Sequence, residues 1–313
     1  MLTFISRRVL AGVLTVLTIS VLGFFLLYLG GRDTARRIVG DTADPEIVAR
    51  KAEELGLNRP IIVQFFDWAG SALTGDLGRS WFSGQPVTEA LASRLPVTLS
   101  LTIGAVLLTA IVGTILGVLA ATRRGSVDST IQVGSFVAAA IPGFLVALVL
   151  VLIFAIGLGW FPATGYIRPD TSFVGWLSTI TLPVIALAIG AIASIAQQVR
   201  GSMLDAQRLD YVRTLRARGI PNRRVVYGHV LRNSAGPALS VLGIQFIVMF
   251  GGAVVVEQVF SLPGLGQTAV SATVQGDIPL IMGLIVMTAV IVLIINLAVD
   301  LLQGWLNPKV RLS

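Results

Sequence analysis

The side chains that most often perform catalysis or hold metal ions are scarce in this chain. Its 313 residues include no cysteine and a single histidine, His229. The absence of cysteine excludes disulfides, iron–sulfur clusters and thiolate zinc sites. An isolated imidazole with no carboxylate beside it in the sequence lacks the further ligands that a metal site needs. We therefore expect no metal site and interpret His229 as a residue that serves local hydrogen bonding or packing.

A nucleotide-binding loop is absent from the sequence as well. Such a loop requires Gly-Lys-Ser or Gly-Lys-Thr, because backbone amides and the lysine together hold the phosphates. The two lysines are Lys51, which follows Arg50, and Lys309, which follows Pro308. The sequence also contains no G-x-S-x-G motif and no pair of intramembrane aspartates for acid–base chemistry. We predict that the chain has no catalytic residue and is not an enzyme.

The composition indicates a membrane protein. Hydrophobic residues make up 55% of the sequence and charged residues 12%, whereas a soluble domain is roughly 25% charged. Six long uncharged runs could each supply a helix of about 20 residues, the length that crosses the hydrocarbon layer. We predict an all-α polytopic membrane protein with six transmembrane helices. An uncleaved N-terminal helix within 1–31 is followed by a core, 95–313, with spans near 97–121, 130–156, 177–199, 237–256 and 279–301.

The positions of the basic residues predict the orientation. Short cytoplasmic loops of membrane proteins carry an excess of lysine and arginine. The segment 200–236 contains eight arginines, and Lys309 and Arg311 follow the last span. The short loops on the other side hold only Arg168. The sequence therefore predicts that both termini are cytoplasmic. Because the arginines lie at membrane edges instead of on a polar domain, we expect no nucleic-acid partner.

The segment 32–94 is extracytoplasmic in this topology and too long for a simple connection. Asp44 and Pro45 predict the start of a short helix that ends at Gly56. Pro60 to Leu73 predicts a second helix, with Ile61, Phe65, Trp68 and Leu73 along one side. We interpret this segment as a small helical cap on the membrane, as a docking surface for an extracytoplasmic partner, or as both.

The cytoplasmic segment 200–236 is the most informative part of the chain. Leu204 to Arg218 is predicted to be one helix, with apolar residues on one side and arginines on the other. Gly219 and Pro221 then end it, since glycine tolerates a left-handed turn and proline cannot donate within a helix. A basic loop that only meets anionic lipid would need no such compact helix. We favour a docking element over that alternative.

Motifs along nearly the whole chain resemble one family. In the cytoplasmic segment they are Asp210-Tyr211-Val212-Arg213-Thr214-Leu215-Arg216-Ala217-Arg218-Gly219, then His229-Val230-Leu231-Arg232-Asn233 and Pro237. Elsewhere they are Gly56-Leu57-Asn58-Arg59-Pro60, Gly75-Asp76-Leu77-Gly78, Ile141-Pro142-Gly143-Phe144, Phe161-Pro162-Ala163-Thr164-Gly165-Tyr166 and Glu257-Gln258-Val259-Phe260-Ser261-Leu262-Pro263-Gly264. These resemble bacterial ABC-importer permeases of the dipeptide/oligopeptide branch, of the first-permease type. Arg213-Thr214-Leu215 departs from the Glu-Ala-Ala of the general importer signature, which fits the peptide branch.

The resemblance implies a set of partners in the bacterial inner membrane. The chain would pair with a second, homologous permease subunit, two cytoplasmic ATPase subunits and an extracytoplasmic substrate-binding protein. It would bind no cofactor itself, and ATP and Mg²⁺ would be bound by the ATPases. The residues that would couple the chain to an ATPase are Asp210, Tyr211, Arg213, Arg216, Arg218, Gly219 and Pro221, supported by His229, Arg232 and Asn233.

A second group of residues is a candidate outer gate or part of the translocation pathway. It comprises Glu257, Gln258, Pro263 and Gly264, near the outer end of the fifth span. A carboxylate within a membrane is costly and is therefore a candidate for a functional role. Pairing of Glu257 with an arginine of the partner permease, or simple exposure at an interface, remains an alternative.

Peptides are the substrate that the resemblance implies. Nickel chelates, glutathione or another small solute are alternatives with the same architecture, and the direction of transport is inferred from the family alone. A secondary transporter is a different class. It would require ionisable residues at mid-membrane for ion coupling, and the centres of the predicted spans contain none.

Overall fold

The computed structural model describes residues 2–29, 32–40, 42–123 and 125–306. Within these ranges the regular elements are helices. One isolated β-bridge pairs Arg79 with Pro86. Lys309 and Arg311, used above for the orientation, and the predicted boundary at residue 31 lie outside the described residues. The chain divides into two compact units: unit 1 is Met1–Pro96 with Pro263–Leu297, and unit 2 is Val97–Leu262 with Ala298–Ser313. Each unit is described by itself.

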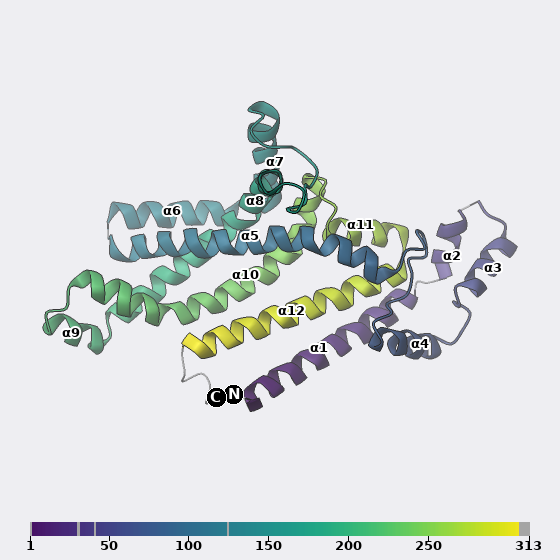
Figure 1. Cartoon of the computed structure of the whole chain (residues 1–313), viewed down its shortest axis with the longest axis horizontal. Helices are drawn as coiled ribbons and strands as arrows, with labels where there is room; N and C mark the ends of the chain where they lie inside the picture. Colours follow the sequence, from purple (N-terminus) through teal and green to yellow (C-terminus); the bar gives the residue numbers. More distant parts are fainter. Residues whose placement is uncertain (1, 30–31, 41, 124, 307–313) are drawn as a thin grey trace. The chain divides into compact units, whose positions relative to one another are not determined.

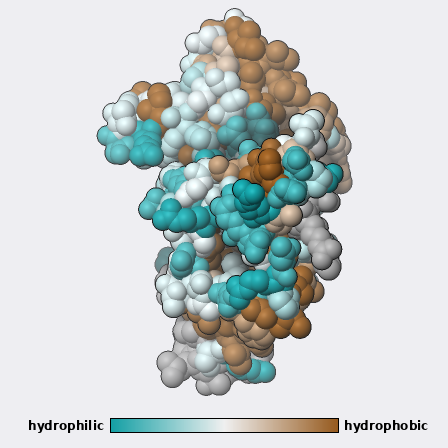
Figure 2. Space-filling model, turned by 90° about the vertical axis from the view of Figure 1, so that its right-hand side faces the viewer, coloured by the Kyte–Doolittle hydropathy of each residue, from teal (hydrophilic) through white to brown (hydrophobic). Residues whose placement is uncertain are grey.

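Unit 1 is organised around the first and last long helices. Phe24 of α1 is fully buried against Ile278 and Met282 of α12, and aromatic residues of α4 complete this core. Figure 2 faces the side on which α2, α3 and α4 lie, where hydrophilic side chains are seen beside hydrophobic ones. The elements of unit 1 are α1 (Leu2–Leu29), α2 (Arg32–Val39), α3 (Pro45–Glu54), α4 (Ile61–Leu73), α11 (Leu265–Gln275), the start of α5 (Val87–Thr122) and most of α12 (Ile278–Leu306).

The two short helices predicted between 44 and 73 are confirmed. Asp44 caps α3 by accepting a hydrogen bond from the Glu46 amide at 3.3 Å, and Pro45 is the first helical residue. Gly56 follows the helix with a φ of +70°. The prediction that Leu73 shares a side with Ile61 is wrong, because Leu73 is 86% exposed. Twelve residues at about 100° each place it roughly 120° around the helix from Ile61.

Unit 2 is built around α8, which contacts α6, α7 and α10 (Figure 1). Glycines allow α5 to approach α8 closely: a Cβ on Gly117 would lie 2.7 Å from the Ala196 carbonyl oxygen. The elements are the rest of α5, α6 (Ser126–Ala140), α7 (Gly143–Leu150), the π-helix η1 (Val151–Gly157), α8 (Phe173–Gln207), α9 (Asp210–Ala217), the π-helix η2 (Arg224–Val230), α10 (Leu231–Val259) and the end of α12.

The third predicted span differs most from expectation. Five helices are long and apolar enough to cross a membrane, and a sixth span exists only if α6 and the α7–η1 segment count as one. These two pieces meet at 94° instead of forming one helix over 130–156. Proline at 142 lacks an amide donor and pushes the preceding residue out of the helical region. Ile141 accordingly adopts φ −85° and ψ 121°, and a new helix begins at Gly143.

The helix predicted over 204–218 is also divided in two. Residue Leu204 belongs to the end of α8, and α9 starts afresh at Asp210. Between them, Leu209 is extended, with φ −70° and ψ 146°. The amide of Leu209 still bonds to Ala206 while its carbonyl begins α9 by accepting from Val212. An aspartate at the first position of the new helix interacts favourably with its dipole. The loop predicted over 200–236 is thus largely helical.

Candidate functional site

Residues 208–223 form a compact unit around α9, called here the α9 module. Val212 is fully buried, and Leu215 and Ile220 are partly buried beside it. They pack on apolar side chains from the end of α8 and from η2, among them Met203, Ala206, Val225, Val226 and Val230. This packing holds the short helix against the end of α8 and against η2, which leads into α10.

Gly219 ends α9 in a Schellman motif. Its φ is +75°, and its amide donates to the Arg216 carbonyl at 2.9 Å. The next amide, that of Ile220, donates to the Leu215 carbonyl at 3.2 Å, and the side chains of these two residues belong to the same apolar cluster. Only glycine adopts this backbone conformation without cost. The geometry supports the prediction that Gly219 provides the sharp exit from the helix.

The outer side of the α9 module is basic. Asp210 and Arg213 form an ion pair at 3.5 Å, but their side chains are 95% and 77% exposed. A pair this exposed contributes little to stability. The conformation of the module is therefore determined by its buried side, and the exposed side remains available for contacts. Its exposed predicted site residues are Asp210, Tyr211, Arg213, Arg216, Arg218, Gly219 and Pro221.

A groove beside α9 brings the predicted supporting residues together. His229, Arg232 and Asn233 line it with Tyr211, and its volume is about 550 Å³. The Asn233 amide donates to the Tyr211 hydroxyl at 3.4 Å. His229 is exposed here, so the residue interpreted as a packing histidine lies on the surface of this groove. The structure thus gathers both parts of the predicted coupling set at one end of unit 2.

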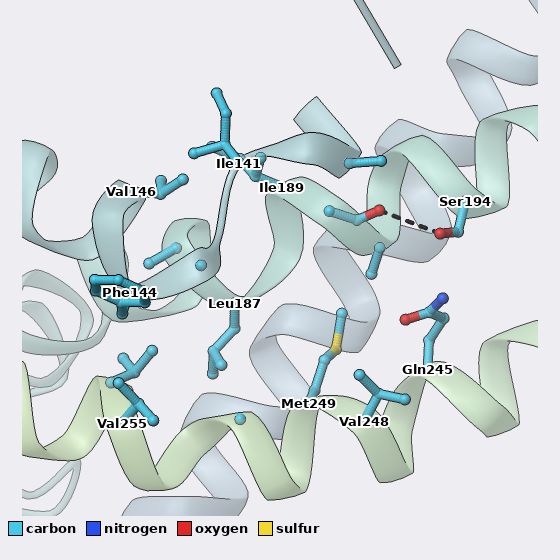
Figure 3. A pocket seen from close by; sticks show the side chains of 17 residues that line it. Ile141, Phe144, Val146, Leu187, Ile189, Ser194, Gln245, Val248, Met249 and Val255 are labelled. Atoms are coloured by element: carbon cyan, nitrogen blue, oxygen red, sulfur yellow. Dashed lines mark hydrogen bonds between the residues drawn. The ribbon is translucent and has the colours of Figure 1, made fainter. Parts of the chain in front are cut away.

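A second cavity in unit 2 escaped the sequence analysis. It is a cleft of about 430 Å³ between the α6–α7 break, α8 and α10 (Figure 3). We call it the α8–α10 cleft. Its lining is mostly apolar, for example Phe144, Leu187 and Met249, and the residues that line it include none with a charge. Ser194 and Gln245 supply polar groups, and the Ser194 hydroxyl bonds back to the Gly190 carbonyl at 3.3 Å.

The only sequence signal for this cleft was Pro142. The break after Ile141 turns α7 away from α6 and leaves room beside α8. Small residues enlarge this space, since a Cβ on Gly190 would meet nothing within 4 Å. Neither feature reveals by itself that α10 lies across from the break, because that is a tertiary contact.

Glu257 is fully buried near the end of α10. Its Oε1 accepts a hydrogen bond from the Thr98 hydroxyl of α5 at 2.5 Å, and its carbonyl accepts from the Leu262 amide at 2.9 Å. Gln258 is exposed. Neither residue lines the α8–α10 cleft. This placement favours a structural connection between α5 and α10 for Glu257.

Pro263 and Gly264 belong to unit 1, where they lead into α11. Pro263 is exposed and Gly264 is buried. A polar contact that no sequence pattern indicated holds the other end of α11: Asp277 accepts from the Ser80 hydroxyl at 2.5 Å and from the Trp81 amide at 3.2 Å. These bonds tie the 75–86 turn to the start of α12. The four residues proposed as an outer gate thus belong to two units, Glu257 and Gln258 to unit 2 and Pro263 and Gly264 to unit 1, and their role in gating stays a prediction.

An ion pair that the sequence analysis did not identify joins α6 and α8. The Arg200 guanidinium donates to both Asp128 carboxylate oxygens, each at 2.6 Å. Both side chains are partly buried. A bidentate pair in this environment is stronger than a surface pair. Elsewhere in the described residues, no three His, Cys, Asp or Glu side chains come together in a way that could hold a metal ion.

The long apolar helices, the uncharged cleft and the basic helical module define a class, that of membrane permeases. Residues 113–312 match the model of the family described as binding-protein-dependent transport system inner membrane component. Residues 1–102 match the model of the N-terminal region of such components. The chain belongs to this family of ABC-importer permeases. It is a multi-pass inner-membrane protein that works with ATPase and substrate-binding partners and is not itself the nucleotide-binding subunit.

Full-length relatives agree with this assignment. A permease protein of Brucella abortus (strain 2308), whose name assigns it to a peptide transport system, is 38% identical over 312 residues and 99% of each chain. The oligopeptide transport system permease protein AppB of Bacillus subtilis is 35% identical over 99% of this chain and 100% of its own. The glutathione transport system permease protein GsiC of Salmonella choleraesuis is also 35% identical, over 99% of each.

A solved structure shares the fold. An inward-facing crystal structure of the MetNI methionine ABC transporter matches with a TM-score of 0.58 and 19% identity. The match covers 69% of this chain and 96% of the other. At this identity the likeness concerns the fold alone.

Proposed function

We propose that this chain is one of two permease subunits of a peptide importer and forms half of the path for dipeptides or oligopeptides. The relatives AppB and the Brucella permease support peptides as the substrate class. GsiC, which is as similar as AppB, supports glutathione as the second candidate. Glutathione is itself a small peptide derivative, so one path could accommodate both kinds of substrate.

The complete transporter would contain a second homologous permease, two cytoplasmic ATPases and an extracytoplasmic binding protein. ATP and Mg²⁺ would be bound by the ATPases, because this sequence has no Gly-Lys-Ser or Gly-Lys-Thr loop. We place both termini in the cytoplasm and count six spans, with α6 and α7–η1 as one bent span. The eight arginines in the segment that includes α9 support this orientation.

The α9 module would be the coupling element. Its basic outer side would seat in a groove of one ATPase, where arginines can form charge-assisted hydrogen bonds to carboxylates. Because its inner side packs on α8 and η2, a displacement of α9 would move these helices with it as a rigid body. This packing is the observation that carries the proposal, since a loosely attached loop would transmit no force.

The α8–α10 cleft would be this chain's contribution to the path. Walls without charge bind neither end of a zwitterionic peptide tightly, and a weak site allows a substrate to leave as well as to enter. Movement of α8 by the α9 module would reshape the cleft directly, because α8 forms one of its walls.

The test is uptake into vesicles that contain the whole transporter, with ATP inside and binding protein outside. We expect ATP-dependent uptake of labelled di- or oligopeptide. Replacing Arg213 and Arg216 together by glutamate should abolish uptake and reduce ATPase co-purification at least tenfold. Arg168→Glu is the matched control, since Arg168 is also exposed but lies in a different loop.

Two results would refute the proposal. One is transport by this chain without ATPases or ATP, which would indicate a secondary transporter. The other is normal coupling in the double glutamate variant. A panel of peptides of graded length beside glutathione would decide between the two substrate candidates, because only one class should support uptake through the cognate binding protein.

A further inference from the structure

Helix α4 of unit 1 carries three different surfaces. Its inner face packs on α1: the Phe65 ring stacks on Phe25 at 5.7 Å and meets Phe24 edge-on at 5.3 Å, and Trp68 lies 5.6 Å from Phe24 between ring centroids. These contacts fix how the helix is rotated about its axis. The directions of the other two surfaces are therefore determined.

One flank of α4 is apolar and exposed. Ile62 is 59%, Phe66 67% and Leu73 86% exposed. At about 100° per residue, these three side chains fall within roughly 40° of one another around the helix. An exposed row of large apolar side chains is unfavourable in water, so this flank requires a partner.

The opposite flank of α4 is polar. Gln64, Asp67 and Ser71 follow one another at helical spacing, and Asp67 forms an exposed ion pair with Arg59 at 2.6 Å. Their mean direction is about 150° from that of the apolar flank at 100° per residue. The helix thus has three sides: one packs on α1, one is apolar and exposed, and one is polar and suited to water.

We propose that α4 lies along the membrane surface, with Ile62, Phe66 and Leu73 inserted into the lipid and Asp67 directed to water. The helix that it packs against, α1, has the length and composition of a membrane span, and the contacts with α4 lie near the end of that span, at Phe24 and Phe25. A helix attached at the end of a membrane span lies at the level of the lipid surface, so lipid is the apolar medium within reach of its exposed flank. Interfacial helices of this kind have a charged face opposite an apolar one.

A soluble protein is a less suitable occupant for this flank. Apart from the Arg59–Asp67 pair on the polar flank of α4, the helical charged residues nearby in the sequence lie on α2 and α3, for example Arg37, Glu46 and Lys51. A polar partner would find its hydrogen-bonding groups there. The apolar flank of α4 offers it none.

The chain has no cysteine, so single cysteines can be introduced and labelled with a nitroxide one at a time. The test positions are Ile62, Phe66 and Leu73, and the matched control is Ser71 on the polar flank of the same helix. The complete transporter is placed in phosphatidylethanolamine–phosphatidylglycerol vesicles. Collision of each label with oxygen, which concentrates in lipid, is compared with collision with a water-soluble nickel chelate.

We expect the ratio of oxygen to nickel collisions to be at least several-fold higher at Phe66→Cys and Leu73→Cys than at Ser71→Cys. Equal ratios on both flanks would overturn the proposal. So would a flank that is open to both reagents and becomes protected when the binding protein is added, since that result identifies a protein dock. Leu73 is at the end of the helix, so the collision ratio measured at Leu73→Cys remains interpretable even if Phe66→Cys disturbs the packing.

Discussion

Gly219 shows how much of the candidate site depends on the backbone of one residue. Its positive φ and two hydrogen bonds turn the chain at the end of α9 and return Ile220 to the buried side. Without this turn, the apolar side of the α9 module would lose one of its three anchoring side chains. The basic outer side would then have no fixed position.

Substitution of Gly219 should separate coupling from binding. Gly219→Pro forces φ to about −65°, which is incompatible with the observed +75°, and removes the amide that donates to the Arg216 carbonyl. We expect it to abolish uptake in a correctly inserted protein while the binding protein keeps its affinity. Gly219→Asn should retain most activity, because asparagine tolerates the left-handed region. Normal uptake by the proline variant would contradict the role assigned to this turn.

The contribution of the Asp128–Arg200 ion pair to stability can be tested by substitution. Asp128→Asn leaves a partly buried guanidinium with a weaker partner, and we expect a loss of about 1–3 kcal/mol in stability. Thermal unfolding of the detergent-solubilised chain would measure it. Exchanging the two residues, as Asp128→Arg with Arg200→Asp, should recover part of the loss. An exchange variant no more stable than the single variant would show that the pair itself contributes nothing.

Among the helices, prolines have unequal effects. Pro142 ends one helix and starts another at 94°, whereas Pro96, Pro183 and Pro237 lie inside continuous helices. Proline removes the same donor at each position. Whether the chain bends at a proline depends on the neighbouring helices, and the sequence does not show which helices are neighbours. This is why the bend at 142 and the cleft beside it were not predictable in form.

The close approach of α5 and α8 can be tested by substituting a glycine at their contact. A Cβ on Gly117 would lie 2.7 Å from both the Ala196 oxygen and the Val199 Cβ. We expect Gly117→Ala to destabilise unit 2 by about 1–3 kcal/mol, as overpacking does. Gly134→Ala is the matched control, because nothing lies within 4 Å of its Cβ position. Equal melting temperatures for the two variants would show that α5 and α8 can separate at little cost.

The sequence predicted the ends of helices correctly where the signal is local. Asp44, Pro45 and Gly56 mark the ends of α3 correctly, and Gly219 marks the end of α9. It failed where contacts are long-range: the buried Asp277 bonds to Ser80, almost two hundred residues earlier in the chain. The sequence could propose the coupling residues as a set because they all lie in one short segment, 210–233. The cleft was missed because its lining comes from three separate segments.

For the whole molecule, the distribution of charge predicts one orientation in the membrane. The arginines around α9 and the extracytoplasmic segment 32–94 should lie on opposite sides. We expect cysteines at Gln85 and Thr171 to react with an impermeant maleimide in spheroplasts, and a cysteine at Arg223 to react only after permeabilisation. All three positions are exposed. Reaction of Thr171→Cys only after permeabilisation would mean that α6 and α7–η1 do not form a span.

The break at Ile141 has a consequence for how the cleft can be studied genetically. The first amide groups of a helix have no partner within it, and in α7 these belong to Gly143 and Phe144, which line the cleft. Side-chain substitution leaves an amide in place, so a mutational scan would miss these groups. Their hydrogen-bonding capacity is insensitive to sequence drift, and it suits peptides, whose carbonyls are the same whatever their side chains. Replacing single amides by esters would reveal the contribution that alanine scanning cannot.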